Sequence, residues 1–115
     1  MSSDIDAIKD ALQQWVAAIN AHRADTMMTL FSDDVVFIQP PADPFVGKAA
    51  VARLYRAAFR AYHVHERLRY EDIRIIGARA TARVAEHIEM KPRTGGEVVD
   101  FTETDAMRFR RQRDG

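Results

Sequence analysis

The stretch from Val99 to Phe109 combines carboxylates with large apolar side chains in a pattern that could support acid–base chemistry. Because side chains alternate across a strand, Glu103 and Asp105 are expected to share one face with the apolar residues Phe101, Met107 and Phe109. A carboxyl group held away from water either finds a partner or keeps its proton, and a protonated acid can donate a hydrogen bond to a substrate. Asp105 is therefore the first candidate catalytic residue. The alternative is an acid that pairs with one of the arginines or reaches solvent at a rim.

His87 is a second candidate, because the unperturbed pKa of histidine lies near neutrality and suits a general base. Ala85, His87 and Glu89 share one face of a predicted strand, while Val84, Ile88 and Met90 share the other. The second set is more apolar and is the natural choice for the core, which would turn His87 outward. The sequence leaves open which face His87 occupies.

The histidines also raise the alternative of a metal site. His63 and His65 lie two positions apart and share one face of a predicted strand. His87 and Glu89 share one face of the next predicted strand, so the two pairs could form a metal site. A two-residue turn at Gly77 would place the two pairs on opposite faces, whereas a bulge between them would place both on one face. Their spacing matches no established ligand motif, so we favour solvated or ion-paired histidines and predict no metal and no cofactor.

The elements that position these residues follow from periodicity. Apolar residues at helical spacing predict a helix over residues 4–21 and another after Gly47, with a short helix capped by Asp25 between them. The segment 35–38 reads as a strand that stops before Pro40, and 40–47 reads as a turn or short edge hairpin. The remainder predicts a meander of long strands, with a β-bulge near 71–72 and turns at 77–78 and 94–96. This order predicts an α+β fold with helices packed on one face of a curved antiparallel sheet.

Composition limits the classes of function. The 115 residues fit one domain over residues 1–115, and 17 basic residues balance 17 acidic ones, so neither a nucleic acid nor an anionic membrane is an expected partner. Cysteine is absent, which excludes disulfides and thiolate chemistry. The N-terminus lacks the features of a signal peptide and no apolar run reaches membrane-spanning length, so a cytoplasmic protein is expected.

The chain resembles the SnoaL-like and ketosteroid-isomerase-like group of the nuclear transport factor 2-like superfamily. The resemblance is strongest over residues 15–21, 30–36 and 44–51, which read WVAAINA, LFSDDVV and PFVGKAAV. It implies a cone-shaped, cystatin-like fold in which a curved sheet wraps around a long N-terminal helix, and an apolar cavity open at one end. It also implies homodimers built on the outer sheet face. Relatives continue into a final strand, so we expect either a shortened chain or a partner that covers the open sheet edge.

Against the bacterial ketosteroid isomerases the match is mixed. Asp105 falls where those enzymes carry the protonated aspartate of their oxyanion hole, and Trp15 falls at the position of the oxyanion-hole tyrosine. An indole N–H can donate one hydrogen bond but lacks the acidity of a phenol. Gln39 falls where the isomerases carry the aspartate that moves the proton, and an amide cannot act as a general base. Steroid isomerisation by that mechanism is therefore not expected.

Together these observations predict a protein that binds a small hydrophobic molecule and acts as an isomerase, cyclase or dehydratase. Asp105 would donate a hydrogen bond or a proton, Glu103 or His87 would exchange protons, and Trp15 and Gln39 would orient the ligand. The predicted apolar lining comprises Phe31, Phe45, Leu54, Tyr55, Phe59 and Met107. The alternative is a non-catalytic ligand-binding or dimeric assembly module, in which Asp105 forms a structural ion pair.

Overall fold

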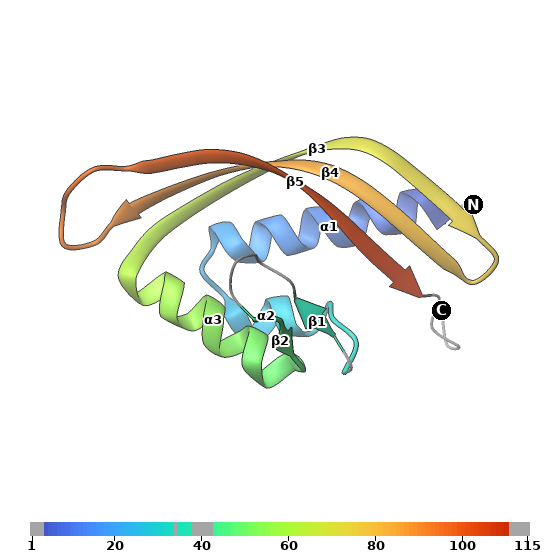
Figure 1. Ribbon diagram of the computed structural model, residues 1–115, viewed down its shortest axis with the longest axis horizontal. Helices are drawn as coiled ribbons and strands as arrows, with labels where there is room; N and C mark the ends of the chain where they lie inside the picture. The colour runs from blue at the N-terminus through green and yellow to red at the C-terminus, as the bar shows by residue number, and fades with distance from the viewer. Residues whose placement is uncertain (1–3, 34, 38–42, 111–115) are drawn as a thin grey trace.

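A computed structural model of the chain describes residues 4–33, 35–37 and 43–110. The helices within these ranges are α1 (Asp4–Asn20), α2 (Ala24–Met28) and α3 (Lys48–Ala61). The strands are β1 (Val36–Phe37), β2 (Phe45–Val46), β3 (Tyr62–Ile76), β4 (Arg79–Pro92) and β5 (Val99–Arg110). Figure 1 shows two layers, with the long strands β3, β4 and β5 curving over α1 and α3. The predicted α+β class is confirmed. Gln39 lies outside the described residues.

The long strands form one antiparallel sheet in the order β3-β4-β5, and β1 pairs with β2 in a small hairpin. The register between β3 and β4 shifts between Tyr70 and Asp72, which confirms the β-bulge predicted there. A bulge increases local twist and bends the strand that carries it. The bend helps the sheet to arch over the helices, as Figure 1 shows.

Helices α1 and α3 each bury one face against the concave face of the sheet, and α2 packs against both helices. Along α1 the buried residues recur at helical spacing, and they are Ile8, Leu12, Trp15, Ala18 and Ile19. They join Met27 of α2, Val51 of α3 and Val84 of β4 in a single core cluster. None of the helices in the described ranges is long and apolar enough to cross a membrane.

The short helix α2 differs from its sequence prediction at its N-terminus. It begins at Ala24 with Arg23 in the capping position, and no side chain caps it. Asp25, the predicted cap, lies in the first turn, and its carboxylate forms an ion pair with Arg56 of α3. The prediction was wrong because the tertiary contact with α3 takes the carboxylate that a local cap would have used.

Candidate active site

Four carboxyl side chains gather on the concave face of the sheet: Glu66 of β3, Glu86 of β4, and Glu103 and Asp105 of β5. We call these residues the carboxyl cluster. Register brings them together, because Glu86 lies directly opposite Glu103 and Val84 lies opposite Asp105. Carboxylate oxygens of Glu86, Glu103 and Asp105 lie within 4.8 Å of one another. Glu66 is 5 % exposed and Glu86 is 1 % exposed, whereas Glu103 and Asp105 are half-buried.

Helix α1 holds Glu66 in place through the backbone of β3. The side chain of Asn20 donates a hydrogen bond to the Glu66 carbonyl at 3.1 Å and accepts one from the Glu66 N–H at 2.8 Å. The Tyr70 hydroxyl on the same strand donates to the Lys9 carbonyl at 3.3 Å. These bonds fix β3 against the helix, and strand alternation then points the Glu66 side chain inward. Sequence reasoning had missed this role of Asn20.

Burial and mutual repulsion shift the protonation of the cluster. Burial raises the pKa of Glu86 to about 11, aided by its hydrogen bond with Asp105 and by repulsion from Glu66, Asp105 and Glu103. Burial also raises the pKa of Glu66 to about 8, with Asp105 and Glu103 adding repulsion. The pKa of Glu103 is raised as well, first by burial and then by the Asp105 charge. Glu86 therefore carries a proton at neutral pH.

The lack of donor groups around the cluster agrees with a proton on Glu86. Oε2 of Glu66 and Oε1 of Glu86 are buried and meet no donor group in the described part of the chain. Glu86 lies within hydrogen-bond reach of Glu66, Glu103 and Asp105. A bond between two carboxyl groups requires one of them to be protonated, since an ionised carboxylate can only accept. Glu86 sits at the centre of these contacts and is the natural donor.

The arginines that the structure describes do not neutralise the cluster. Within residues 4–33, 35–37 and 43–110, the ion pairs that form involve none of the four carboxyl groups. The basic residues of the adjoining strands occupy alternate positions and are exposed, among them Arg67 on β3, Arg83 on β4 and Arg108 on β5. The sequence left open an ion pair between Asp105 and an arginine. The described residues form no such pair.

Tyr55 of α3 lies near the cluster and contacts other aromatic rings. Burial raises the pKa of Tyr55 well above its usual range, and repulsion from Glu66, Glu86, Asp105 and Glu103 raises it further. The Tyr55 ring lies 5.8 Å from Phe37 and 6.0 Å from Phe59, measured between centroids. The predicted lining residues Phe31, Phe45, Tyr55 and Met107 pack against the core, and Leu54 is half-buried on α3.

Trp15 lies in the core on α1 and is 6 % exposed. Its indole Nε1 is buried and has no acceptor among the described residues. A buried donor without a partner costs about 1–3 kcal/mol, so such a group is available to a polar atom of a ligand. This property fits the ligand-orienting role expected of Trp15.

His87 points to the opposite side of the sheet from the carboxyl cluster. It follows Glu86 on β4, and its Nε2 lies 2.7 Å from Asp100 Oδ1 and 3.8 Å from Glu89 Oε1. The structure thus settles the face that the sequence left open, and His87 does not join Asp105 and Glu103. The bulge in β3 brings His65 opposite Glu89 on this same outer face.

Among the residues that the structure describes, two groups of side chains have the ligand types for a metal ion. Glu86, Glu103 and Asp105 form one group, and His87, Glu89 and Asp100 form the other. Oxygen ligands of the first group suit Mg²⁺ or Ca²⁺, whereas the second adds an imidazole. In the carboxyl cluster, a cation and a proton are alternative ways to relieve the same repulsion.

Sequence reasoning found Asp105 and Glu103 but missed Glu66 and Glu86, which are the two most buried members of the cluster. The signal was present in the strand parity. Glu86 lies on the same strand face as the apolar residues Val84 and Ile88. Glu66 likewise shares a face with Val64 and Leu68. A carboxyl group within an apolar series on three neighbouring strands indicates a shared buried site.

A SnoaL-like domain model matches residues 12–115 of the chain. The chain belongs to this SnoaL-like family. As a SnoaL-like protein it also matches a conserved protein from Planctomyces limnophilus, at 28 % identity over 97 % of this chain and 87 % of that one, with a TM-score of 0.92. Among proteins with curated functional descriptions, none matches significantly.

More distant structures share the fold of this SnoaL-like domain. A ketosteroid isomerase-like protein from Erwinia carotovora atroseptica is 18 % identical over 100 % of this chain and 89 % of that one, with a TM-score of 0.87. A nuclear-transport-factor-2-like protein from Streptomyces avermitilis, provisionally named a dehydratase, is 18 % identical, with coverages of 97 % and 89 % and a TM-score of 0.84. The predicted SnoaL-like family and the predicted fold are confirmed.

Proposed function

We propose that this SnoaL-like protein is a cofactor-independent isomerase, cyclase or dehydratase that acts on a small hydrophobic substrate. The observation that carries the proposal is the carboxyl cluster, in which Glu86 holds a proton beside three further carboxyl groups. Perturbed pKa values of several groups at one place are typical of catalytic sites. Glu103 and Asp105 are half-buried, and the proposal places the substrate against their exposed side.

Each member of the cluster has a distinct role in the proposal. Glu86 and Asp105 form a hydrogen-bonded carboxyl pair that shares a proton and donates it, or a hydrogen bond, to an oxygen of the substrate. Glu103, whose pKa is raised toward neutrality, removes a proton from carbon and returns it to another position. In a dehydration the shared proton instead leaves with the hydroxyl group as water.

Apolar residues hold the rest of the substrate. Tyr55 and its aromatic neighbours provide a surface for a ring or chain beside the cluster, and the Trp15 indole donates one hydrogen bond. Gln39, which lies outside the described residues, keeps the orienting role that the resemblance implies. No step in this scheme uses His87, which faces the other side of the sheet.

Thermal stabilisation by candidate ligands provides the first test. We expect lipophilic ketones, epoxides or aromatic polyketides to raise the melting temperature, because a ligand at 100 times its Kd adds about 2.7 kcal/mol of stability. Asp105→Asn should reduce this stabilisation. Asp100→Asn is the matched control, since Asp100 is a carboxylate of the same strand that pairs with His87 on the outer face. Equal stabilisation of both variants would contradict the proposal.

Proton exchange distinguishes catalysis from binding. A ligand found in the thermal screen is incubated with the protein in D₂O and followed by NMR for deuterium uptake beside its carbonyl group. Wild-type protein should catalyse the exchange, and Glu103→Gln should abolish it while ligand binding remains. Binding without exchange in the wild type would favour the non-catalytic ligand-binding alternative.

The outer face of the sheet supports a separate proposal about assembly. Small side chains of β5, namely Thr102, Thr104 and Ala106, are exposed there beside Ala85 of β4. Between the exposed arginines of this face, these small residues let a second copy approach closely, so we propose a homodimer through this face. Thr104→Arg should then yield monomers in light scattering coupled to size-exclusion chromatography, and a monomeric wild type would contradict the proposal.

A further inference from the structure

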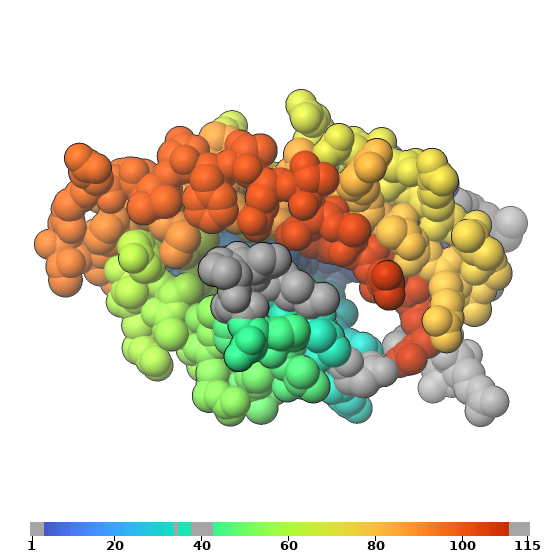
Figure 2. Space-filling view, viewed as in Figure 1, coloured from blue at the N-terminus to red at the C-terminus, as the bar shows by residue number. Residues whose placement is uncertain are grey.

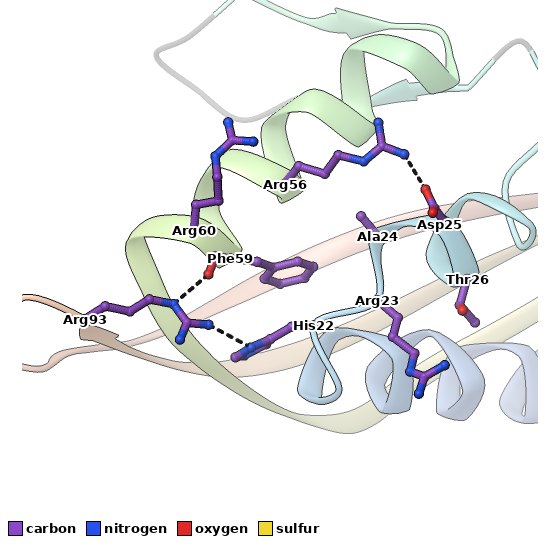
Figure 3. Close-up of a pocket in the computed structure, with 9 residues that line it drawn as sticks. All are labelled: His22, Arg23, Ala24, Asp25, Thr26, Arg56, Phe59, Arg60 and Arg93. Atoms are coloured by element: carbon purple, nitrogen blue, oxygen red, sulfur yellow. Dashed lines mark hydrogen bonds and ion pairs between the residues drawn. The ribbon is translucent and has the colours of Figure 1, made fainter.

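A hollow lined by arginines lies where α2, the end of α3 and the turn after β4 meet, away from the carboxyl cluster. We call it the arginine pocket, and Figure 3 shows its lining. The lining residues are His22, Arg23, Ala24, Asp25, Thr26, Arg56, Phe59, Arg60 and Arg93, around a volume of about 550 Å³. A smaller hollow of about 340 Å³ shares His22, and neither hollow includes Asp105.

The charges of the pocket are unbalanced. Its four arginines face one carboxylate, Asp25, and that group pairs with Arg56. In the described part of the chain, Arg23, Arg60 and Arg93 have no carboxylate partner. The whole chain is electrically neutral, so this excess is a local segregation of charge. Guanidinium groups cannot lose their protons, so an anion or solvent must offset the repulsion.

The Phe59 carbonyl and two histidine rings lie around the Arg93 guanidinium at the pocket. Its Nε donates to the Phe59 carbonyl at 2.8 Å, and its Nη1 and Nη2 lie 3.2 Å from His63 Nε2 and His22 Nδ1. The Arg93 charge lowers the pKa of His63, with help from desolvation and from His22 and Lys91, so that histidine stays neutral. These contacts fix the position of the guanidinium without compensating its charge.

Two further arginines of the pocket, Arg23 and Arg60, are exposed. Figure 3 shows both extending away from the Phe59 ring. Rotation about their side-chain bonds allows either group to turn toward a ligand. His22 stacks on Phe59 with a centroid separation of 5.0 Å, which forms a flat aromatic wall next to the charged groups.

We propose that the arginine pocket binds the phosphate group of a small phosphorylated molecule. Arginine matches phosphate through paired hydrogen bonds, and a dianion fits an excess of positive charge better than a carboxylate does. The volume lies within the range typical of small-molecule sites. The inference is independent of the proposed acid–base chemistry, because the two sites have no residue in common.

Isothermal titration with phenyl phosphate at low ionic strength tests the proposal. We expect saturable binding to the wild type and weaker binding of benzoate, which carries the same ring with a single charge. Arg60→Gln and Arg93→Gln should each weaken phenyl phosphate binding about tenfold, because each removes one charge-assisted hydrogen bond. Benzoate binding as tightly as phenyl phosphate would replace the phosphate assignment with a carboxylate one.

Two further variants distinguish a site from general attraction to positive charge. Arg53→Gln is the matched control, since Arg53 is an exposed arginine of α3 outside the pocket, and its phenyl phosphate affinity should equal that of the wild type. Asp25→Asn should tighten binding several-fold, because it releases Arg56 from its ion pair. Absence of wild-type binding, or equal weakening by Arg53→Gln and Arg60→Gln, would overturn the proposal.

Discussion

The carboxyl cluster and the arginine pocket each collect side chains of one charge, yet they differ in how the repulsion is relieved. In the cluster, burial removes water and the carboxyl groups take up protons, as the raised pKa values of Glu66 and Glu86 show. In the pocket, the guanidinium groups stay charged and remain exposed to solvent. A neutralised buried cluster can donate and accept protons, whereas a charged open pocket can attract an anion. The two regions are therefore suited to different chemistry.

The pH dependence of stability should show the largest effect. Above about pH 4.5, the usual pKa of glutamate, the folded protein holds protons on Glu66 and Glu86 that the unfolded chain has lost. The free energy of unfolding should therefore fall as pH rises toward 8, by up to about 1.4 kcal/mol per pH unit for each such carboxyl group. Urea denaturation between pH 5 and about pH 8 measures this slope. A flat or rising curve would mean that the cluster is ionised.

Replacing the central carboxyl group should have the next largest effect on stability. Glu86→Gln keeps a neutral hydrogen-bond donor and removes the group that must hold a proton, so at about pH 8 it should stabilise the fold by up to about 5 kcal/mol. The variant should also flatten the pH dependence. The same substitution at Glu89, on the outer face, serves as the control and should leave the pH dependence unchanged. Destabilisation by Glu86→Gln at about pH 8 would argue that Glu86 is ionised there.

The two hydrogen bonds between Asn20 of α1 and the Glu66 backbone of β3 should contribute a smaller effect. Asn20→Ala removes both hydrogen bonds to the Glu66 backbone and should cost about 1–3 kcal/mol of stability. If these hydrogen bonds position the cluster, the pH dependence of the free energy of unfolding should also weaken, since Glu66 would gain access to water. Chemical denaturation of Asn20→Ala at about pH 5 and about pH 8 separates the two effects. Gln14→Ala, on the exposed side of the same helix, should change neither quantity.

The smallest effect on stability is expected in the arginine pocket. Arg60→Gln removes an exposed charge and should change the free energy of unfolding by less than about 0.5 kcal/mol. Denaturation at low and high salt measures the change, and low salt should reveal any relief of repulsion. A loss of stability comparable to that of Asn20→Ala would show that the pocket is a structural element rather than an open surface.

Periodicity predicted much of the fold. The helical spacing of Ile8, Leu12 and Trp15 marks the face of α1 that is buried, and the change of strand parity after Tyr70 marks the bulge. These patterns are local, so a single sequence contains them. The cap of α2 was mispredicted because Asp25 pairs with Arg56, which lies 31 positions further along the chain.

The candidate site was only half predictable for a related reason. Glu103 and Asp105 share one strand, so their common face follows from alternation alone. Their proximity to Glu66 and Glu86 depends on the register between three strands, which a bulge shifts by one position. The arginine pocket likewise joins residues from three separate elements. Contacts between residues far apart in the chain leave no local sequence pattern. The single carboxyl groups on otherwise apolar strand faces did, however, indicate a buried acidic site.

Direct observation of the Glu86 proton tests the central claim. Carbon-13 NMR of the glutamate carboxyl groups, assigned with Glu86→Gln and Glu66→Gln, follows each group through a pH titration. The account predicts that the Glu86 signal keeps the chemical shift of a protonated acid through pH 8, while Glu66 titrates near about 8. A Glu86 signal that titrates with a pKa of about 4.5, the ordinary value for glutamate, would contradict the account.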